Sequence, residues 1–311
     1  MKLIVTGSIA YDYLMSFSGR FADDLPASRG ERMDVSLLVD SMSKQRGGCA
    51  PNIAYTLALL RERPCLMAAA GHDFGEYRQW LEGIGIDTSL VRIVPDKLTA
   101  SYFCSTDSDH SQISSFYAGA MMHAVELSFR RIEGASLVII APNAPAAMLQ
   151  YADECRTLNI PFIFDPGQEC ARMSGEHLRS GLAGAKMVIC NTEDFELIRA
   201  KTGLGERAIL QQADLLVITR GADGCSLYQG ASRADVKAVP PQHVVDGTGV
   251  GDAFRGGFMK GLAEGAPYTV CAQLGSVAAT YSLEHLGATS HTYTLEEFKH
   301  RYEEHFGALT V

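Results

Sequence analysis

The feature that constrains this chain most is a glycine-punctuated stretch over residues 244–258, which reads Val-Val-Asp-Gly-Thr-Gly-Val-Gly-Asp-Ala-Phe-Arg-Gly-Gly-Phe. The two β-branched residues at its start predict the end of a strand, the alternating glycines predict a turn, and a helix rich in small residues is predicted from Asp252 onward. Glycines directly before a helix leave backbone N–H groups free at the positive end of the helix dipole. The stretch therefore predicts an anion-binding site.

Asp252 stands at the edge of this predicted site, where a carboxylate repels an anionic ligand. Its position is explained if it takes a proton from a hydroxyl that attacks an incoming phosphoryl group. The alternative is a simple helix cap, since aspartate is preferred at N-cap positions. Asp246 before the glycines and Thr248 among them favour the catalytic interpretation. The spacing is neither that of a Walker A loop nor that of the dinucleotide fingerprint Gly-x-Gly-x-x-Gly.

Residues 246–254 resemble the C-terminal signature of the ribokinase-like (PfkB) carbohydrate and nucleoside kinases, usually Asp-Thr-x-Gly-Ala-Gly-Asp. Gly247 stands where threonine is usual, and Val250 stands where alanine is usual. The resemblance implies that Asp252 is the catalytic base. It also implies a hole for the transferred phosphoryl group, formed by the backbone amides of Gly249, Val250, Gly251 and Asp252.

The composition sets the class of protein and excludes several partners. A length of 311 residues allows one large α/β domain or two ordinary ones, and 47% hydrophobic residues are typical of a soluble globular protein. The net charge of −9 without a basic run argues against a nucleic-acid partner. Eight scattered cysteines fit a reducing cytosol, and no segment resembles a signal peptide or a membrane span of about 20 apolar residues. We expect a cytoplasmic protein without a membrane partner.

Two polar positions in the N-terminal part are candidates for substrate binding. Asp12 follows an apolar first strand, where a carboxylate is costly to bury unless it is paired; a solvated turn residue is the alternative. Asn52 lies in the first turn of an Ala/Leu-rich helix after the turn Gly47-Gly48, and simple capping is the alternative there. The resemblance implies that Asp12 binds two sugar hydroxyls, and that Gly47, Gly48 and Asn52 bind ribose-type hydroxyls.

Four segments with alternating or apolar patterns are predicted to be strands outside the core: 33–39, 41–45, 99–104 and 112–117. We expect residues 13–45 and 97–118 to form a small β-sheet lid inserted into an α/β core made of 1–12, 46–96 and 119–311. A closing lid excludes water, which competes with the substrate hydroxyl. Phe116 in the lid could stack on a base or sugar, although sheet packing explains it equally well. The oligomeric state is left open by the sequence; lid sheets of the kinases that the chain resembles often pair their edges, so the resemblance is compatible with a homodimer through the lid.

Strands and helices alternate from Phe129 onward, which predicts βαβ units and a parallel sheet. Polar turns follow the apolar strands at 165–167, 191–194 and 219–224, and the stretch 246–252 is expected at the same edge, where such sheets bind ligands. With the resemblance, the fold class is a ribokinase-like three-layer αβα core with a parallel sheet and a small β-sheet lid.

The resemblance also implies the residues that bind ATP and metal ions. Asn191-x-x-Asp194 resembles the Asn-x-x-Glu motif that helps hold Mg²⁺ and the phosphates; the shorter aspartate would need a bridging water, and Glu193 is the alternative. The remaining implied nucleotide contacts are Thr219, Gly221 and Gly224 in a turn, with Ser276 and Ala279 on a helix over 271–286 beside the adenine. A monovalent cation such as K⁺ is implied at Asp246, Thr248 and Gly287.

Together these patterns predict an ATP-dependent kinase that phosphorylates a primary hydroxyl. Residues 116–121, 165–168 and 251–255 are similar to the adenosine-kinase-like branch of bacteria and archaea, so a nucleoside is the first candidate substrate. Ribose, fructose or 2-keto-3-deoxygluconate would use the same chemistry. A non-catalytic sensor on the same fold is a rival, although it would not need a base at Asp252. A dinucleotide-dependent oxidoreductase is weakened by the missing Gly-x-Gly-x-x-Gly.

Overall fold

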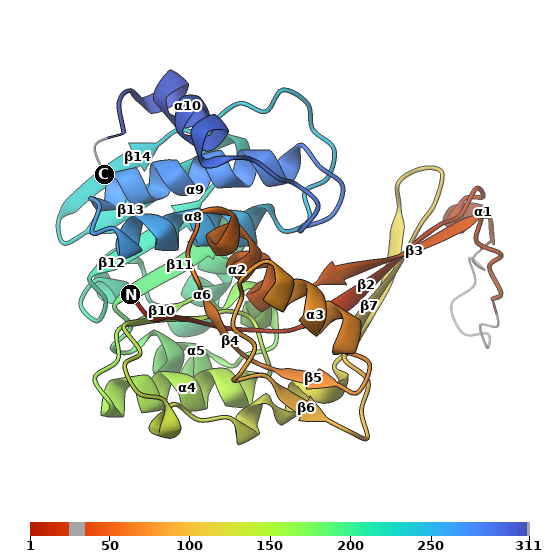
Figure 1. The fold of residues 1–311 in the computed structure, drawn as a ribbon, viewed down its shortest axis with the longest axis horizontal. Helices are drawn as coiled ribbons and strands as arrows, with labels where there is room; N and C mark the ends of the chain where they lie inside the picture. Colours follow the sequence, from red (N-terminus) through yellow and green to blue (C-terminus); the bar gives the residue numbers. More distant parts are fainter. Residues whose placement is uncertain (25–34, 310–311) are drawn as a thin grey trace.

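An eight-stranded sheet forms the centre of the computed structural model, which describes residues 1–24 and 35–309 (Figure 1). The strand order is β14-β13-β12-β11-β10-β9-β1-β4, with every neighbouring pair from β12 to β4 parallel and β13 and β14 antiparallel. The strands are β1 (Leu3–Thr6), β4 (Cys65–Met67), β9 (Leu137–Ile140), β10 (Phe162–Phe164), β11 (Met187–Asn191), β12 (Leu215–Thr219), β13 (Cys225–Gln229) and β14 (Ser232–Val236). Because the parallel strands share one direction, the turns after β1, β10, β11 and β12 lie at one edge of the sheet.

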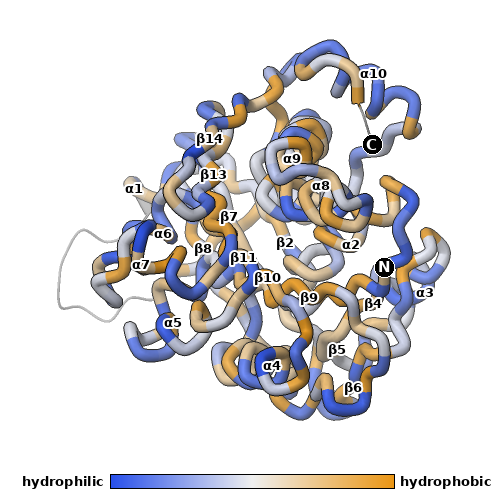
Figure 2. The backbone as a smooth tube through the Cα atoms, turned by 90° about the vertical axis from the view of Figure 1, so that its left-hand side faces the viewer, coloured by the Kyte–Doolittle hydropathy of each residue, from blue (hydrophilic) through white to orange (hydrophobic). Residues whose placement is uncertain are grey.

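Helices cover both faces of this sheet (Figure 2). One face carries α2 (Cys49–Leu59), α3 (Gly75–Gly83), α8 (Val250–Ala263) and α9 (Tyr268–Leu283). The other carries α4 (Pro145–Thr157), α5 (Gly175–Leu182), α6 (Thr192–Thr202) and α7 (Glu206–Ile209). Side chains of β1 alternate between the two interiors, with Val5 in the first and Ile4 in the second. The expected three-layer αβα core is confirmed.

Small residues let α8 and α9 approach closely. A Cβ atom at Gly257 would lie 2.6 Å from the carbonyl oxygen of Leu274, and one at Gly275 would lie 2.7 Å from that of Phe254. A larger side chain at either position would push the helices apart. This contact explains the small-residue pattern that follows Asp252 in the sequence.

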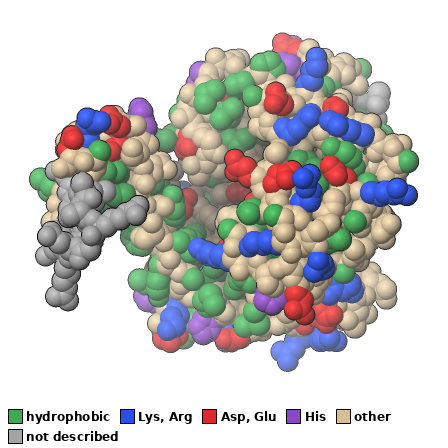
Figure 3. Space-filling model, turned by 180° about the vertical axis from the view of Figure 1, so that it is seen from behind, with side chains coloured by type: hydrophobic (Ala, Val, Ile, Leu, Met, Phe, Trp, Pro, Cys, Tyr) green, Lys and Arg blue, Asp and Glu red, His purple; other side chains and the backbone are tan. Residues whose placement is uncertain are grey.

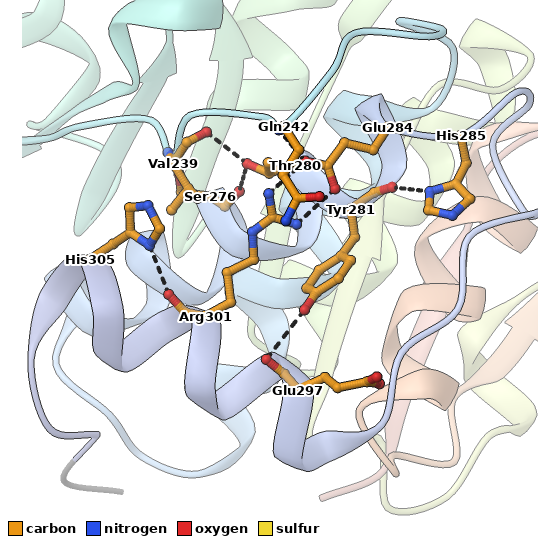
Figure 4. A network of polar contacts seen from close by, with 10 residues as sticks. All are labelled: Val239, Gln242, Ser276, Thr280, Tyr281, Glu284, His285, Glu297, Arg301 and His305. Atoms are coloured by element: carbon orange, nitrogen blue, oxygen red, sulfur yellow. Dashed lines mark hydrogen bonds and ion pairs between the residues drawn. The ribbon is translucent and has the colours of Figure 1, made fainter.

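The C-terminal helix α10 (Leu295–Phe306) packs on α9 and begins with a capping box between Thr294 and Glu297. Its buried Arg301 donates two hydrogen bonds to Glu284, at 2.8 and 2.6 Å (Figure 4). Glu284 also accepts a hydrogen bond from the backbone N–H of Gln242 at 2.6 Å. One buried ion pair therefore fastens α10 to the end of α9 and to the segment between β14 and α8.

A separate four-stranded sheet projects from the body (Figure 1). Its order is β3-β2-β7-β8, with β2 (Ala10–Ser16), β3 (Ser41–Gly47), β7 (Ala100–Thr106) and β8 (Gln112–Tyr117). We call it the lid sheet. Asp12 lies within β2, opposite Gln45 and Tyr102, and not in a turn after the first strand. The division of the chain into a core and a lid made of residues 13–45 and 97–118 stays a prediction. The lid sheet itself extends slightly further, because β2 begins at Ala10 and β3 ends at Gly47.

The remaining elements connect these parts. They are α1 (Phe21–Asp24), β5 (Ala69–Gly71), β6 (Arg92–Val94), and the 3₁₀ helices η1 (Gly119–Glu126), η2 (Phe129–Arg131), η3 (Gly167–Ala171) and η4 (Gly221–Asp223). Across residues 1–24 and 35–309, the helices are all too short or too polar to cross a membrane.

Some predicted elements differ from the structure. Val244 and Val245 form no strand; they lie exposed beside the end of α9, where the N–H of Val245 donates to the carbonyl of Leu283. β-branched residues without a neighbouring strand have no ladder to join. Residues 35–39 are likewise outside any strand, because pairing with β2 begins only near Asp40; residues 33–34 lie outside the described part of the chain. The last long helix before α10 ends at Leu283, before the predicted end at residue 286.

Candidate active site

A cavity of about 560 Å³ lies between the lid sheet and the carboxyl edge of the central sheet, and Figure 3 shows the hollow between the two parts. It brings together predicted site residues that are far apart in the sequence. These are Asp12, Gly48, Asn52, Phe116, Thr248, Gly249 and Asp252. The starts of α2 and α8 therefore meet the inner face of the lid sheet at one place.

The start of α8 has the geometry of an anion site. Gly249 is the N-cap residue with φ 75°, a left-handed conformation that favours glycine, and no side chain caps the helix. The N–H groups of Gly251 and Asp252 find no acceptor among the described residues, and that of Val250 makes a long bond of 3.4 Å to Gly247. The alternative that Asp252 caps the helix is therefore wrong. Its carboxylate lies in the first turn, beside free backbone donors.

Asn52 fixes the Asp252 carboxylate. Its Nδ2 donates to Asp252 Oδ2 at 2.8 Å, across 200 residues of sequence. Helix α2 has Gly48 at its N-cap without a side-chain cap, so the capping alternative for Asn52 is wrong as well. Asn52 Oδ1 is buried and has no partner among the described residues. Because a buried acceptor without a donor is costly, this oxygen favours a ligand that brings a hydroxyl.

Burial raises the pKa of Asp252 to about 6. The nearby carboxylates of Asp165 and Asp12 also raise it, whereas the hydrogen bond from Asn52 and the charge of Arg255 lower it. Burial, with a contribution from Asp246, likewise raises the pKa of Asp12 to about 6. A carboxylate with such a pKa is charged at neutral pH and is still basic enough to accept a proton efficiently.

The Gly47-Gly48 turn passes directly against Asp12 and the end of β1. A Cβ atom at Gly47 would lie 2.2 Å from Asp12 Oδ2, and one at Gly48, where φ is 96°, would lie 2.5 Å from the carbonyl oxygen of Ser8. Glycine is therefore required at Gly48, where backbone atoms block a side chain, whereas a side chain at Gly47 would displace the Asp12 carboxylate. The Asp12 carboxylate thus packs directly against the backbone of Gly47, just before the start of α2.

A buried ion pair beside Asp252 was not identified from the sequence. Arg255 donates two hydrogen bonds to Asp165, one of them at 2.7 Å to Oδ1, and a third at 2.9 Å to the carbonyl of Gly251. Both side chains are almost fully buried. Two features could have indicated this pair: an arginine among the apolar and small residues of a helix, and a carboxylate directly after an apolar strand.

One further wall of the cavity was not predicted from the sequence. It is formed by Gln168 and Glu169 of η3 and by Arg172, all of which line the cavity. Burial raises the pKa of Glu169, and the nearby Arg172 lowers it. Asp165 comes shortly before η3 in the chain, so its ion pair with Arg255 links the segment that carries this wall to α8.

The predicted phosphate and metal residues lie at the same sheet edge. Asn191 and Thr219 are neighbours at the ends of β11 and β12, and Asn191 Oδ1 accepts the N–H of Asp194 at 2.7 Å as the N-cap of α6. Burial and the nearby Asp165 raise the pKa of Asp194, so a cation close to this carboxylate is favourable. Glu193 is exposed. Across residues 1–24 and 35–309, no three His, Cys, Asp or Glu side chains form a metal cluster.

Gly221 and Gly224 frame the turn η4 after β12, both with positive φ, at 56° and 82°. Ser276 is buried, and its hydroxyl accepts the N–H of Val239 at 2.8 Å, so it fastens the chain; Ala279 lies one turn further along α9. The contact of these four residues with a nucleotide stays a prediction.

The predicted monovalent-cation residues are held together by one carboxylate. Asp246 accepts the N–H and hydroxyl of Thr248 at 2.9 and 2.8 Å, and the N–H of Gly287 at 2.8 Å. Both carboxylate oxygens therefore stabilise the loop before α8 and the turn after α9. A cation there would have to be bound chiefly by backbone carbonyl groups.

Comparisons with known proteins agree with this geometry. Residues 8–294 match the model of a family described as pfkB family carbohydrate kinase. A nucleoside kinase of Methanothermobacter thermautotrophicus is 29% identical over 310 residues, covering 98% of this chain and 96% of that protein. The structure of Burkholderia thailandensis nucleoside kinase in complex with inosine has a TM-score of 0.89 at 33% identity and 98% coverage of both chains. The ADP–inosine complex of the same enzyme has a TM-score of 0.87 at 32% identity, with 99% of this chain and 98% of that chain covered.

Proposed function

Since the chain belongs to the pfkB family of carbohydrate kinases and is an ATP-dependent kinase, we propose that it phosphorylates the primary hydroxyl of a nucleoside. The observation that carries the proposal is the set of groups that meet at one cavity. Asp252, at the start of α8 beside its free N–H groups, lines the cavity together with Asp12 and with Asn52, whose Oδ1 has no partner among the described residues. The aromatic side chains Tyr102 and Phe116 and the wall of η3 complete it.

In the proposed mechanism, Asp12 and Asn52 bind the ribose hydroxyls and aim the primary hydroxyl at Asp252. Asp252 accepts the proton of that hydroxyl as its oxygen attacks the γ-phosphorus of ATP; such general-base catalysis contributes roughly 10²–10⁴ in rate. The N–H groups at the start of α8 stabilise the negative charge on the transferred phosphoryl oxygens. ADP leaves from the side of β11 and β12.

Mg²⁺ would neutralise charge on the β- and γ-phosphates, as in other phosphoryl transfers. Asp194 is the residue that fits this role best, because its buried carboxylate beside Asp165 has a raised pKa and gains from a nearby cation. Its shorter side chain favours contact through a bridging water. Glu193 stays the alternative, and K⁺ at the Asp246 loop stays a prediction from the resemblance.

A nucleoside is favoured over a free sugar by two observations. The relatives with nucleoside kinase activity match almost the whole chain, and one is bound to inosine. Phe116 and Gln168 also line the cavity, and their ring and amide suit the face and the polar edge of a nucleobase. An adenosine-like substrate is compatible with these groups, and the substrate panel described next determines which nucleobase is preferred.

The test is ADP release from ATP and Mg²⁺ with a panel of inosine, adenosine, cytidine, guanosine, ribose, fructose and 2-keto-3-deoxygluconate. ATP without acceptor measures background hydrolysis. We expect turnover with one or more nucleosides at kcat/KM at least about tenfold above any sugar. Turnover with a sugar alone would make the chain a sugar kinase. Tight binding of a nucleoside without turnover would make it a sensor.

We also propose that the chain forms a homodimer through the lid sheet. The face of this sheet opposite Asp12 exposes apolar side chains: Met42 (65%), Phe103 (37%), Ile113 (43%) and Tyr117 (45%). Within the part of the chain that the structure describes, β3 and β8 are the edge strands of this sheet, and their outer backbone groups pair with no further strand. Sedimentation velocity should give a dimer that Phe103→Asp dissociates; a monomeric parent protein would contradict the proposal. A cytoplasmic location stays a prediction from the cysteine pattern.

A further inference from the structure

The buried pair of Arg255 and Asp165 connects two parts of the proposed site that are far apart in the sequence. Arg255 lies on α8, one helical turn after Asp252, and its third hydrogen bond goes to the carbonyl of Gly251. Asp165 follows β10 directly and accepts two hydrogen bonds from the guanidinium. A bidentate contact of this kind fixes orientation as well as distance.

Each end of the pair carries a different part of the site. The Arg255 end carries the free N–H groups and the carboxylate of Asp252. The Asp165 end continues through Pro166 into η3, whose Gln168 and Glu169 form the cavity wall. A shift of α8 against β10 would therefore change the distance between Asp252 and a nucleoside held by that wall.

We propose that Arg255 is a positioning residue that locks the catalytic end of α8 to the η3 wall of the nucleoside pocket. This inference rests on the proposed function and extends it to a residue outside the cavity lining. Stability alone is a weak reason for such a pair, because a buried ion pair is often no more stabilising than apolar side chains of similar volume. The pair instead has a specific role, because it links the helix that carries Asp252 to the segment that carries the pocket wall.

The pair also sets the electrostatic surroundings of Asp252. The groups that act on this carboxylate are Arg255 from its own helix, Asp165 after β10, Asp12 from β2 and Asn52 from α2. Cys49 of α2 and Tyr77 of α3 face it as well, and both stay neutral because burial raises their pKa. Loss of Arg255 leaves Asp165 uncompensated and favours the protonated form of Asp252. Loss of the Asp165 charge has the opposite effect.

The test compares Arg255→Met with Lys260→Met, which removes the other ion-paired cation of α8, at the opposite end of the helix, where Lys260 contacts Glu62 and Glu264. With inosine or the best nucleoside of the panel as substrate, we expect kcat of Arg255→Met to fall about 100-fold, the cost of misplacing reacting groups by roughly 1 Å. Its acid limb in kcat/KM should move to higher pH. Lys260→Met should keep the kcat and pH limb of the parent enzyme.

Two further variants separate positioning from loss of folding. Arg255→Lys keeps the positive charge but loses the bidentate contact with Asp165. We therefore expect a reduced kcat, with the acid limb of kcat/KM at nearly the same pH as in the parent enzyme. Asp165→Asn should move the acid limb to lower pH. Parent-like kcat and pH limb in Arg255→Met, or an equal loss in Lys260→Met, would overturn the positioning role while the proposed function stands. A parent enzyme inactive on every nucleoside would overturn both.

Discussion

Asp252 combines three properties that together distinguish it from a helix cap. It lies beside free backbone N–H groups, it accepts a hydrogen bond from Asn52 at 2.8 Å, and burial with neighbouring carboxylates raises its pKa to about 6. A helix cap needs none of these. A general base for a sugar hydroxyl needs all three, because it must be oriented, charged at neutral pH and close to the transferred phosphoryl group.

The first prediction concerns the dependence of activity on pH. Asp252 must be deprotonated to act as base, so kcat/KM should be constant above neutral pH and fall tenfold per pH unit below about pH 6. Asp12, with a similar pKa, steepens the fall if its charged form binds the ribose hydroxyls. Initial rates between pH 4.5 and 9 would measure this. A profile without an acid limb above pH 5 would contradict the role of Asp252.

The second prediction concerns stability. A pKa raised in the folded protein means that the charged form of Asp252 destabilises the fold, and this penalty grows as the pH rises from about 4 to about 6. Asp252→Asn should therefore raise the free energy of unfolding by roughly 1–3 kcal/mol at pH 8, and change it little at pH 4. Urea titrations at the two pH values would measure the difference. If Asp252→Asn left the free energy of unfolding at pH 8 unchanged or lowered it, the charged Asp252 would not destabilise the fold.

At the scale of single elements, the loop before α8 depends on contacts with the turn after α9. Gly249 has φ 75°, and a Cβ atom there would lie 2.3 Å from the Cβ of Ala288. Asp246 joins the same two segments through Gly287. The conformation of the anion site is thus set by a neighbouring loop as much as by its own glycines.

The third prediction follows from this contact. Gly249→Ala should lower kcat by about 10- to 100-fold, because the new side chain displaces the N–H groups from the transferred phosphoryl group. Gly203→Ala is the matched control: Gly203 also has positive φ, 73°, but a Cβ atom there meets no atom within 4 Å. Gly203→Ala introduces the same backbone strain without a steric clash, so this variant should keep the kcat of the parent enzyme. Equal kcat values for the two variants would show that the contact with Ala288 is irrelevant to catalysis.

The fourth prediction concerns α10. Arg301→Met removes one partner of the buried pair with Glu284 and leaves a buried carboxylate, which costs about 3–5 kcal/mol of folding stability. Arg199→Met removes an exposed pair with Glu196, separated by 3.6 Å, and should cost less than about 1 kcal/mol. Urea unfolding of both variants tests the comparison. Similar costs would mean that α10 is not held by this pair.

At the scale of the whole molecule, the sequence predicts the architecture well where local patterns decide. Apolar runs of a few residues mark β9 and β10 with their exact bounds, and the alternation of strands and helices predicts the three layers. The polar turns after β10, β11 and β12 indicate one sheet edge. Asp12, Asn52 and Asp252 were singled out by motifs, and the fold brings them to one cavity.

What the sequence does not predict depends on contacts between distant segments. Arg255 and Asp165 are 90 residues apart, and no local pattern pairs them. Val244 and Val245 favour a strand locally, but the sheet offers them no partner and they lie along the end of α9. The η3 wall was missed for the same reason, since its residues gain a role only when the lid sheet faces them.

The most direct test of the account is the rate of phosphoryl transfer to inosine by the parent enzyme and by Asp252→Asn, with product identified as the 5′-monophosphate and inosine binding measured in parallel. We expect the parent enzyme to form ADP and nucleoside monophosphate in equal amounts. The variant should lose roughly 10²–10⁴ of kcat while it still binds inosine. Equal rates in the two proteins would contradict the account and leave Asp252 without a part in the chemistry.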